Sequence, residues 1–139
     1  MENCLFCKIS KKEIPSAKVY EDENVFAFLD INPVNPGHVL VIPKVHYPRL
    51  SETPEEVAAN LMRVVPKLGN AIMKATGVPA FNVGVNNGKE AGQVVDHTHL
   101  HIMPRHEADG HEMWQGKAYE SEEEMNNIAD KIVASYAST

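Results

Sequence analysis

The chain of 139 residues lacks an excess of positive charge, a long apolar run and a cysteine framework. It carries 13 Lys and Arg against 19 Asp and Glu, a formal net charge of −6, and its longest basic cluster is Lys11-Lys12. No nucleic-acid partner is therefore expected, although a small phosphate-bearing ligand is compatible with this charge. The apolar run from Val39 to Ile42 is far shorter than the roughly 20 residues that cross a bilayer, so no membrane partner is expected either.

Cysteine is scarce, with two residues in the chain against seven histidines. The first ten residues lack the basic and apolar stretches of a signal peptide. We therefore expect a reducing, cytoplasmic location, with cysteine used for metal or redox chemistry. The length predicts a single domain over residues 1–139 with a sizeable core.

Apolar patterning predicts about five strands. Val19-Tyr20 and residues 25–29 flank a polar turn as a hairpin, and residues 39–42 form a buried strand that ends at Pro43. Residues 81–85 and 94–103 are the two remaining strands, joined by a polar loop. Together with two main helices, this order indicates an α+β domain built on a mostly antiparallel sheet.

Both helices have sequence signals at their starts. Thr53, Pro54 and Glu56 predict an N-cap and capping box before an apolar face at positions 57, 61, 64, 68 and 72. Pro66 interrupts this helix and predicts a kink, and Gly77 can close it. A second capping box at residues 121–124 predicts a helix to about residue 136, within a C-terminal helical tail over about residues 107–139.

The segment from His97 to Met103 reads HTHLHIM and is the most informative in the chain. In a strand, His97, His99 and His101 would share one face, with Cα atoms roughly 6.5–7 Å apart, and the residues between them would face a core. The run is internal, so it is not a tag, and a solvated strand face more often carries Lys, Glu and Thr. The pattern predicts a metal site or a histidine-based active site.

Cys4 and Cys7 form a CxxC pair. A thioredoxin-like redox pair needs a strand before the motif, and only three residues precede Cys4. Zinc usually takes four nitrogen or sulfur ligands, and candidates for the other two are His46, after the strand at 39–42, and His97. The alternative is a pair of buried free thiols.

The remaining histidines carry weaker signals. His38 enters the strand at 39–42 from a loop and could face the other histidines, although a single strand-end histidine is usually structural. His106 and His111 lie in the polar tail and are expected to be solvated.

Three stretches together resemble the histidine triad (HIT) superfamily, over roughly residues 4–106. They are Cys4 to Ile9 (CLFCKI), Phe28 to Lys44 with its FLDINP and PGHVLVIPK segments, and Gly92 to Arg105 (GQVVDHTHLHIMPR). The histidine run together with the Gly-Gln pair before it is highly specific to this family. The tail resembles bacterial-type members more loosely.

The resemblance implies an antiparallel sheet with helices, and a homodimer in which two subunits join their sheets. It implies a hydrolase or transferase that binds purine nucleotides and acts on nucleoside 5′-phosphoramidates, adenylates or dinucleoside polyphosphates. By position, His99 would be the nucleophile, Asp30 would hold the ribose hydroxyls, and the phosphate would contact His101, Gln93 and Asn86. The apolar wall around the base would comprise Leu5, Phe6, Ile9, Ile14, Phe28 and Ile31.

Elementary chemistry agrees with these roles. A neutral imidazole is a competent nucleophile near neutral pH if its other nitrogen is held by an acceptor. Attack at the α-phosphorus gives a nucleotidyl-histidine that water then cleaves, which replaces one hard displacement by two easier steps. A single carboxylate can accept hydrogen bonds from both hydroxyls of a ribose.

The resemblance also implies one structural zinc per chain, with Cys4, Cys7, His46 and His97 as ligands. In members without zinc, the residues matching His97 and His38 relay a proton or orient the nucleophile. A metal-bound His97 could not donate a proton from its ligating nitrogen. Asp96 departs from the bulky residue that relatives often carry, and strand alternation would turn it away from the triad.

Two other functions compete with a nucleotide hydrolase acting through His99. The first is a catalytic zinc hydrolase in which His97, His99 and His101 are three ligands and water is the fourth. The second is a non-enzymatic nucleotide sensor or scaffold that contains a structural zinc.

Overall fold

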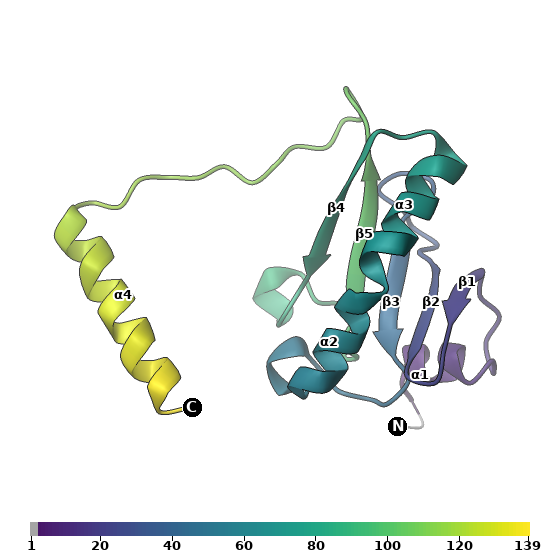
Figure 1. Cartoon of the computed structure of the whole chain (residues 1–139), viewed down its shortest axis with the longest axis horizontal. Helices are drawn as coiled ribbons and strands as arrows, with labels where there is room; N and C mark the ends of the chain where they lie inside the picture. Colours follow the sequence, from purple (N-terminus) through teal and green to yellow (C-terminus); the bar gives the residue numbers. More distant parts are fainter. Residues whose placement is uncertain (1–2) are drawn as a thin grey trace.

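A five-stranded antiparallel sheet forms the centre of the molecule in this computed structural model, which describes residues 3–139 (Figure 1). The strands lie in the order β1-β2-β3-β5-β4, and every neighbouring pair is antiparallel. Their bounds are Lys18–Glu21 for β1, Val25–Leu29 for β2, Val39–Pro43 for β3, Ala80–Val85 for β4 and Leu100–Arg105 for β5. The predicted α+β class and antiparallel sheet are confirmed.

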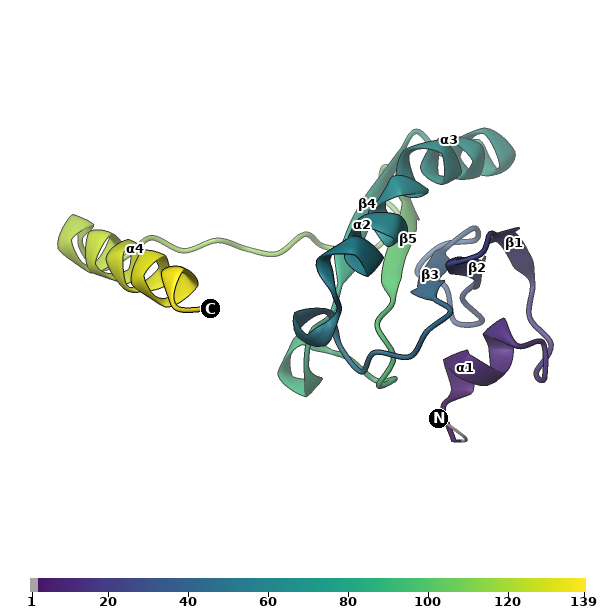
Figure 2. The same ribbon diagram turned by 60° about the horizontal axis from the view of Figure 1, so that its bottom comes forward.

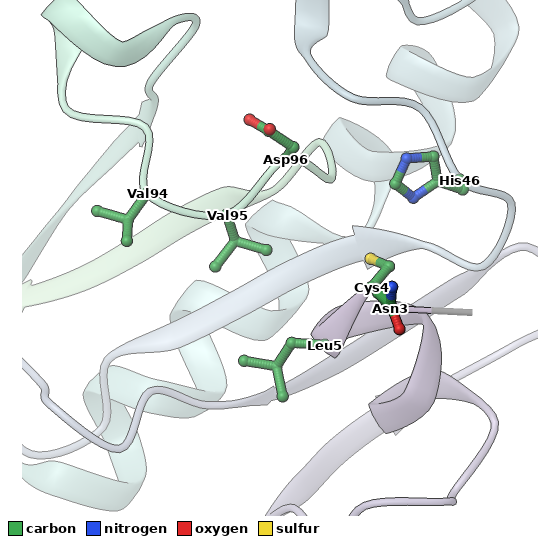
Figure 3. Close-up of a pocket in the computed structure, with 7 residues that line it drawn as sticks. All are labelled: Asn3, Cys4, Leu5, His46, Val94, Val95 and Asp96. Atoms are coloured by element: carbon green, nitrogen blue, oxygen red, sulfur yellow. The ribbon is translucent and has the colours of Figure 1, made fainter. Parts of the chain in front are cut away.

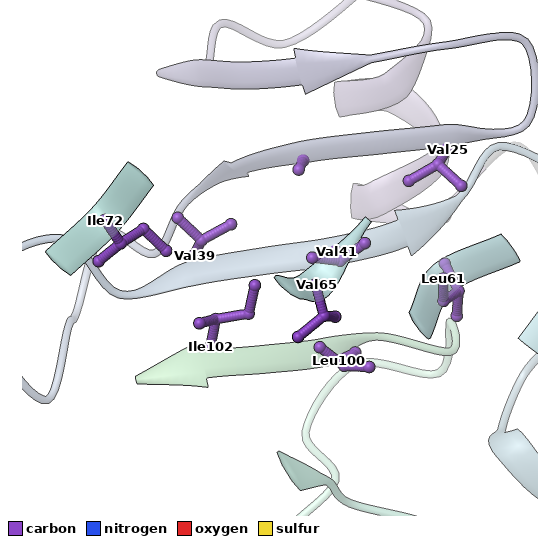
Figure 4. Close-up of a cluster of buried hydrophobic side chains, with 9 residues drawn as sticks. Val25, Val39, Val41, Leu61, Val65, Ile72, Leu100 and Ile102 are labelled. Atoms are coloured by element: carbon purple, nitrogen blue, oxygen red, sulfur yellow. The ribbon is translucent and has the colours of Figure 1, made fainter. Parts of the chain in front are cut away.

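Helices α2 (Glu55–Arg63) and α3 (Val65–Thr76) cover one face of the sheet. The larger cluster of buried apolar side chains lies between these helices and the strands β2, β3 and β5, as Figure 4 shows. Gly69 of α3 lies directly over Phe81 of β4, where a Cβ atom would lie 2.5 Å from the ring, so only glycine permits this close approach. The cluster comprises Val25, Ala27, Val39, Val41, Leu61, Val65, Ile72, Leu100 and Ile102.

Helix α1 (Leu5–Ser10) lies on the opposite face of the sheet (Figure 2). Because strand side chains alternate between faces, Phe26, Phe28, Leu40 and Ile42 point toward α1, where they pack with Phe6 and Ile9. The sequence predicts a CxxC turn here but no helix. The structure therefore adds a short helical layer on this side of the sheet.

Two predicted helix features differ from the structure. The capping box at Thr53 is wrong: Pro54 is the N-cap of α2, and the Thr53 hydroxyl donates to the Arg49 carbonyl instead. A 3₁₀ turn at Leu50–Glu52 draws Thr53 into its own hydrogen bonding. The kink predicted at Pro66 is a break between α2 and α3, which Pro66 permits because it has no N–H to donate. Gly77 ends α3 with φ of 77°, as predicted.

The C-terminal tail is helical only in its second half. Residues 106–110 contain a turn, residues 111–119 run as an extended arm, and α4 (Glu122–Ala137) follows its N-cap Ser121, whose hydroxyl accepts from the backbone N–H of Glu124. The predicted cap is confirmed, but the prediction of a helical tail from about residue 107 is wrong for the arm. Figure 1 shows α4 apart from the sheet. Among residues 3–139, none of the helices combines the length and apolar character needed to cross a membrane.

Candidate active site and metal centre

A cavity of about 440 Å³ opens on the α1 face of the sheet, between α1, β2 and the segment before β5. Eight of the nine residues predicted to hold a nucleotide line it, together with His99 and His101. Leu40 and Val95 also line it and were missed, although the alternation of β3 and the Val94-Val95 pair are signals that point to them. The eight are Leu5, Phe6, Ile9, Ile14, Phe28, Asp30, Ile31 and Asn86.

Gln93 is the ninth, and the structure places it outside the lining of this cavity. Its side-chain amide donates to the carbonyls of Pro48 and Val95, at 2.7 and 2.9 Å, and its oxygen accepts from the N–H of Gly88 at 2.9 Å. The buried Gln93 side chain thus joins the loop between β4 and β5 to the segment that follows β3. Its contact with phosphate stays a prediction.

The histidine run begins before the strand, not inside it. The predicted strand at 94–103 is wrong at its start, because β5 begins at Leu100 and His97 and His99 precede it. The backbone N–H of Thr98 donates to the carbonyl of Tyr47 at 2.7 Å, which holds this segment without a strand ladder. The side chains of this segment still alternate in direction, because the Thr98 hydroxyl hydrogen-bonds to the Thr53 hydroxyl and the Tyr47 carbonyl and not to the histidines beside it.

The protonation of His99 follows from its one short contact. Its Nδ1 lies 2.7 Å from the carbonyl oxygen of His97, and a carbonyl only accepts, so Nδ1 carries the hydrogen. In the neutral ring, Nε2 then holds a free lone pair. The His99 side chain lines the cavity, and its ring is 5.1 Å from that of His101 between centroids.

His38 and His101 form a directed pair beside His99. The N–H of Val34 donates to Nδ1 of His38 at 3.1 Å, so the neutral ring carries its hydrogen on Nε2. That Nε2 lies 2.9 Å from Nδ1 of His101, which therefore accepts. The remaining nitrogen, Nε2 of His101, is buried with no hydrogen-bond partner and carries an N–H available to a ligand. The structure thus brings His38 to the triad.

Burial keeps these rings neutral. Desolvation lowers the pKa of His101 to about 4, with smaller contributions from His99 and His38. Desolvation also lowers the pKa of His99 and of His38, against the opposing effect of the Asp30 carboxylate. At neutral pH the site therefore presents an imidazole lone pair on His99 and an N–H donor on His101.

Asp30 lies at the rim of the cavity, at the end of β2. One carboxylate oxygen accepts from the N–H of Asn32 at 2.8 Å, and the other is 3.7 Å from Nε2 of His38. The second oxygen retains free acceptor capacity toward the cavity that Asp30 lines.

Cys4, Cys7, His46 and His97 converge at the N-terminal end of α1, with their ligand atoms all within 4.8 Å of one another. The sulfur–nitrogen distances are 3.3 to 3.5 Å, and the Nδ1 atoms of His46 and His97 are 3.2 Å apart. A tetrahedral zinc with bonds of about 2.3 Å to sulfur and about 2.0 Å to nitrogen would have edges of about 3.5 and 3.3 Å between these atoms. The four residues fit such an ion.

The ring of His97 is oriented for this role. Its Nε2 lies 2.8 Å from the carbonyl of Pro43 and donates to it, so Nδ1 presents a lone pair to the thiols. Desolvation lowers the pKa of His97 to about 4. A backbone acceptor on the second nitrogen is the usual partner of a metal-ligating histidine.

A second hollow, of about 570 Å³, lies beside the metal cluster. Figure 3 shows its lining, with Val94, Val95 and Asp96 from the segment before β5 and Leu5 from α1. Asp96 is exposed and lines this hollow but not the cavity of His99. His106 and His111 are exposed, as predicted, although His111 also hydrogen-bonds to the Val34 carbonyl at 2.7 Å.

Comparison with known proteins gives the family. The HIT domain model matches residues 11–108. This chain belongs to the HIT family. Protein hit of Bacillus subtilis is 45% identical over 141 residues, which cover 99% of this chain and 97% of that protein.

Two further relatives have names that state an activity. Adenylylsulfatase HINT3 of Arabidopsis thaliana is 54% identical over 107 residues, which cover 77% of this chain and 54% of that protein, so the chain matches about half of the longer relative. Adenosine 5′-monophosphoramidase HNT1 of Saccharomyces cerevisiae is 45% identical over 102 residues, covering 73% of this chain and 62% of that protein.

Solved structures share the fold. A crystal structure from Streptococcus mutans UA159 has a TM-score of 0.94 at 41% identity and covers 98% of this chain and 87% of its own. A zinc-bound histidine triad family protein from Mycobacterium smegmatis has a TM-score of 0.74 at 34% identity, with 99% and 97% coverage.

Proposed function

We propose that this protein is a nucleotide hydrolase that cleaves at the α-phosphate through a covalent intermediate on His99. The observation that carries the proposal is the Nδ1–H of His99 donating to the His97 carbonyl, because it leaves Nε2 as a lone pair inside the cavity. The relatives named adenylylsulfatase and adenosine 5′-monophosphoramidase support the same class of reaction.

In the first step, Nε2 of His99 forms a bond to the α-phosphorus, and the bond from phosphorus to the leaving group breaks. The leaving atom takes the electron pair and a proton from the solvent, which the proton lost by water in the second step replaces. In the second step, water attacks the phosphorus and loses a proton, the P–N bond to His99 breaks, and a nucleoside monophosphate is released. Neutral His99 is regenerated, so no redox change and no net consumption of the enzyme occur.

His101 supports both steps from beside the phosphorus. Its buried Nε2–H, which has no partner within the protein, is suited to donate to a phosphoryl oxygen as negative charge develops. His38 holds His101 in the required tautomer by donating to Nδ1. This arrangement needs no proton from His97, which is engaged with the metal cluster.

The cavity suits a purine nucleoside. The apolar side chains of α1 and β2 offer a wall for the base, with Phe6 and Phe28 edge to face at 5.5 Å between centroids. In this proposal Asp30 accepts from the ribose hydroxyls, and Asn86, which lines the same cavity, contacts the phosphate. Nucleoside 5′-phosphoramidates, adenylates and dinucleoside polyphosphates all present this common part.

We also propose one structural zinc per chain, held by Cys4, Cys7, His46 and His97. The ion would cross-link α1 to the sheet, and the zinc-bound relative from M. smegmatis supports this. A catalytic zinc on the triad is disfavoured because the three rings face different partners. His97 faces the thiols, His99 a carbonyl and His101 the ring of His38. Both thiols are free, which accords with a reducing compartment such as the cytoplasm.

A second copy of this chain is the proposed partner. In the described part of the chain, β4 is an edge strand that pairs only with β5, so its outer edge is available to another sheet. The arm and α4 leave the fold on the β4 side (Figure 1). Sedimentation velocity at increasing concentration tests this, and a monomer throughout would contradict it.

The hydrolase proposal is tested by intact-protein mass after brief mixing with adenosine 5′-phosphoramidate. We expect a transient adenylyl adduct on the wild type and on a His106→Ala control, and none on His99→Ala or His99→Asn, which still bind AMP. Metal content from the same samples should give one zinc per chain. Turnover by the His99 variants would refute the nucleophile. AMP binding without turnover of any phosphoramidate or dinucleotide would favour a non-enzymatic sensor.

A further inference from the structure

Helix α1 carries two sets of functional side chains at once. Cys4, at its N-cap, and Cys7 belong to the metal cluster, whereas Leu5, Phe6 and Ile9 line the cavity. The two sets interleave within six residues. Any shift of this helix therefore moves the metal ligands and the cavity wall together.

Apart from its apolar packing, α1 is tied to the sheet through its thiols. A helix of six residues is about 9 Å long and is not stable alone. Beyond the N–H groups of the residues that directly follow the helix, up to Ile14, the polar contacts of Leu5–Ser10 and its N-cap within residues 3–139 are those of Cys4 and Cys7 with His46 and His97. By contrast, the backbone N–H and the hydroxyl of Thr98, which both donate to the Tyr47 carbonyl, hold the histidine segment without any contact to α1.

Phe6 packs against both the nucleophile and a histidine of the metal cluster. Its ring is buried and contacts His99 edge to face, with 5.0 Å between centroids and an interplanar angle of 83°. The same ring lies 6.0 Å from His97 and 5.5 Å from Phe28. It therefore packs against the nucleophile, a metal ligand and the base wall simultaneously.

We propose that Phe6 is a positioning residue for His99, and that the metal centre sets the nucleotide affinity of the cavity by holding α1, and with it Phe6, against the sheet. This rests on the proposed nucleotide function. The metal then acts on binding from outside the reacting atoms. Loss of the ion frees α1 to move. The sheet stays folded, because its larger core is formed with α2 and α3 on the opposite face.

The test is AMP binding by calorimetry on the zinc-loaded full chain and on the same protein after chelation, with zinc measured in both. For the wild type we expect chelation to raise Kd about tenfold, the size of one well-packed aromatic contact. Phe6→Leu should bind AMP about tenfold more weakly with zinc present and lose most of its response to chelation. Circular dichroism melts establish that each sample is folded.

Phe26→Leu is the matched control, because Phe26 belongs to the same buried cluster as Phe6 but does not line the cavity. It should be less stable yet keep the full response of AMP affinity to zinc. As a second readout, the ¹⁵N signals of the His99 ring should show one Nδ1–H tautomer in the wild type and Phe26→Leu, and a mixture in Phe6→Leu.

Three results would decide against the proposal. An AMP affinity that is the same with and without zinc in folded wild type would overturn the coupling. An equal response to zinc in Phe6→Leu and wild type would overturn the role of Phe6. Failure of the zinc-loaded wild type to bind AMP would instead refute the proposed function, and the coupling with it.

Discussion

Nε2 of His38 lies 2.9 Å from Nδ1 of His101, and the N–H of Val34 determines which of the two nitrogens carries the hydrogen. The N–H of Val34 donates to Nδ1 of His38, so the hydrogen of the neutral His38 ring is on Nε2. Nε2 of His38 therefore donates, and Nδ1 of His101 accepts. A backbone amide on the loop before β3 thereby selects the tautomer of a ring on β5, more than 60 residues away.

Replacing His38 should slow turnover without abolishing nucleotide binding. His38→Leu removes the donor to His101, and loss of one hydrogen bond of about 1.4 kcal/mol would lower kcat about tenfold. His38→Gln, whose amide can still donate, should retain kcat within about threefold of wild type. Steady-state kinetics with adenosine 5′-phosphoramidate measure both, and equal rates for the two variants would contradict the tautomer argument.

His101 should make stability depend on pH in mild acid. Its pKa is about 4 in the fold, against 6.5 for an unperturbed ring, because burial disfavours the charged form. Below pH 6.5 His101 therefore binds a proton in the unfolded chain but not in the folded chain. The free energy of unfolding consequently falls as the pH is lowered from 6.5 to 4. Above pH 6.5 this contribution is constant.

Urea unfolding of wild type and His101→Gln at several pH values isolates this effect from those of Asp30, His38 and His99, which face the same ring. The difference in unfolding free energy between the two proteins should change in favour of the variant as the pH falls from 6.5 to 4. A difference that is constant across that range would show that His101 does not titrate as described.

Asp30 should contribute to affinity only through the ribose hydroxyls. Asp30→Asn keeps an oxygen for the N–H of Asn32 but loses charge and acceptor capacity toward the ligand. We expect AMP affinity to fall about tenfold, as for loss of a charged hydrogen bond, and 2′,3′-dideoxyadenosine monophosphate to bind both proteins equally. Equal losses for both ligands would place Asp30 elsewhere in the mechanism.

Metal removal should distinguish a structural from a catalytic ion. Since the triad rings face separate partners, kcat at saturating substrate should fall only severalfold on chelation, through the looser packing of Phe6 on His99, whereas KM should rise with the weaker nucleotide binding. Complete loss of kcat that returns on adding zinc, in protein that stays folded throughout, would favour the catalytic zinc alternative.

Asp109 should anchor the C-terminal arm. Its carboxylate accepts from the Arg105 guanidinium, the Asn35 amide and two backbone N–H groups, and the Arg105 contact holds the pKa of Asp109 well below its usual range. Asp109→Ala should lower Tm and make residues 106–120 more sensitive to limited proteolysis, while Glu107→Ala, an exposed neighbour, should change neither. Unchanged cleavage in the Asp109 variant would refute the anchor.

Much of the fold is local information and could be read from the sequence. The strands at 25–29 and 39–43 follow from apolar runs, the cap of α4 from Ser121, and the break near Pro66 from a missing N–H. The secondary-structure predictions are wrong where a group elsewhere in the fold forms a hydrogen bond that the prediction had assigned to a local partner. Thr53 hydrogen-bonds to Arg49 and Thr98 instead of capping α2, and Tyr47 holds the backbone at Thr98 where a strand was predicted.

The sequence by itself determined which chemical groups are present and on which side of the chain they lie. It placed three imidazoles in alternation, a pair of thiols three residues apart and an apolar wall with one carboxylate at its end. Their division of labour was decided only by the tertiary structure. Each imidazole has two ring nitrogens, either of which can carry the hydrogen, and the choice between them depends on the hydrogen-bond partner that the fold supplies.

For His97 that partner is the carbonyl of Pro43, which turns the ring's other nitrogen toward thiols about 90 residues away. For His99 it is a carbonyl two residues back, and for His101 it is the ring of His38. The amide of Gln93 went to the backbone of a neighbouring loop for the same reason. A buried donor or acceptor bonds to the group that tertiary packing brings within about 3 Å of it. The spacing of residues along the chain does not specify that group.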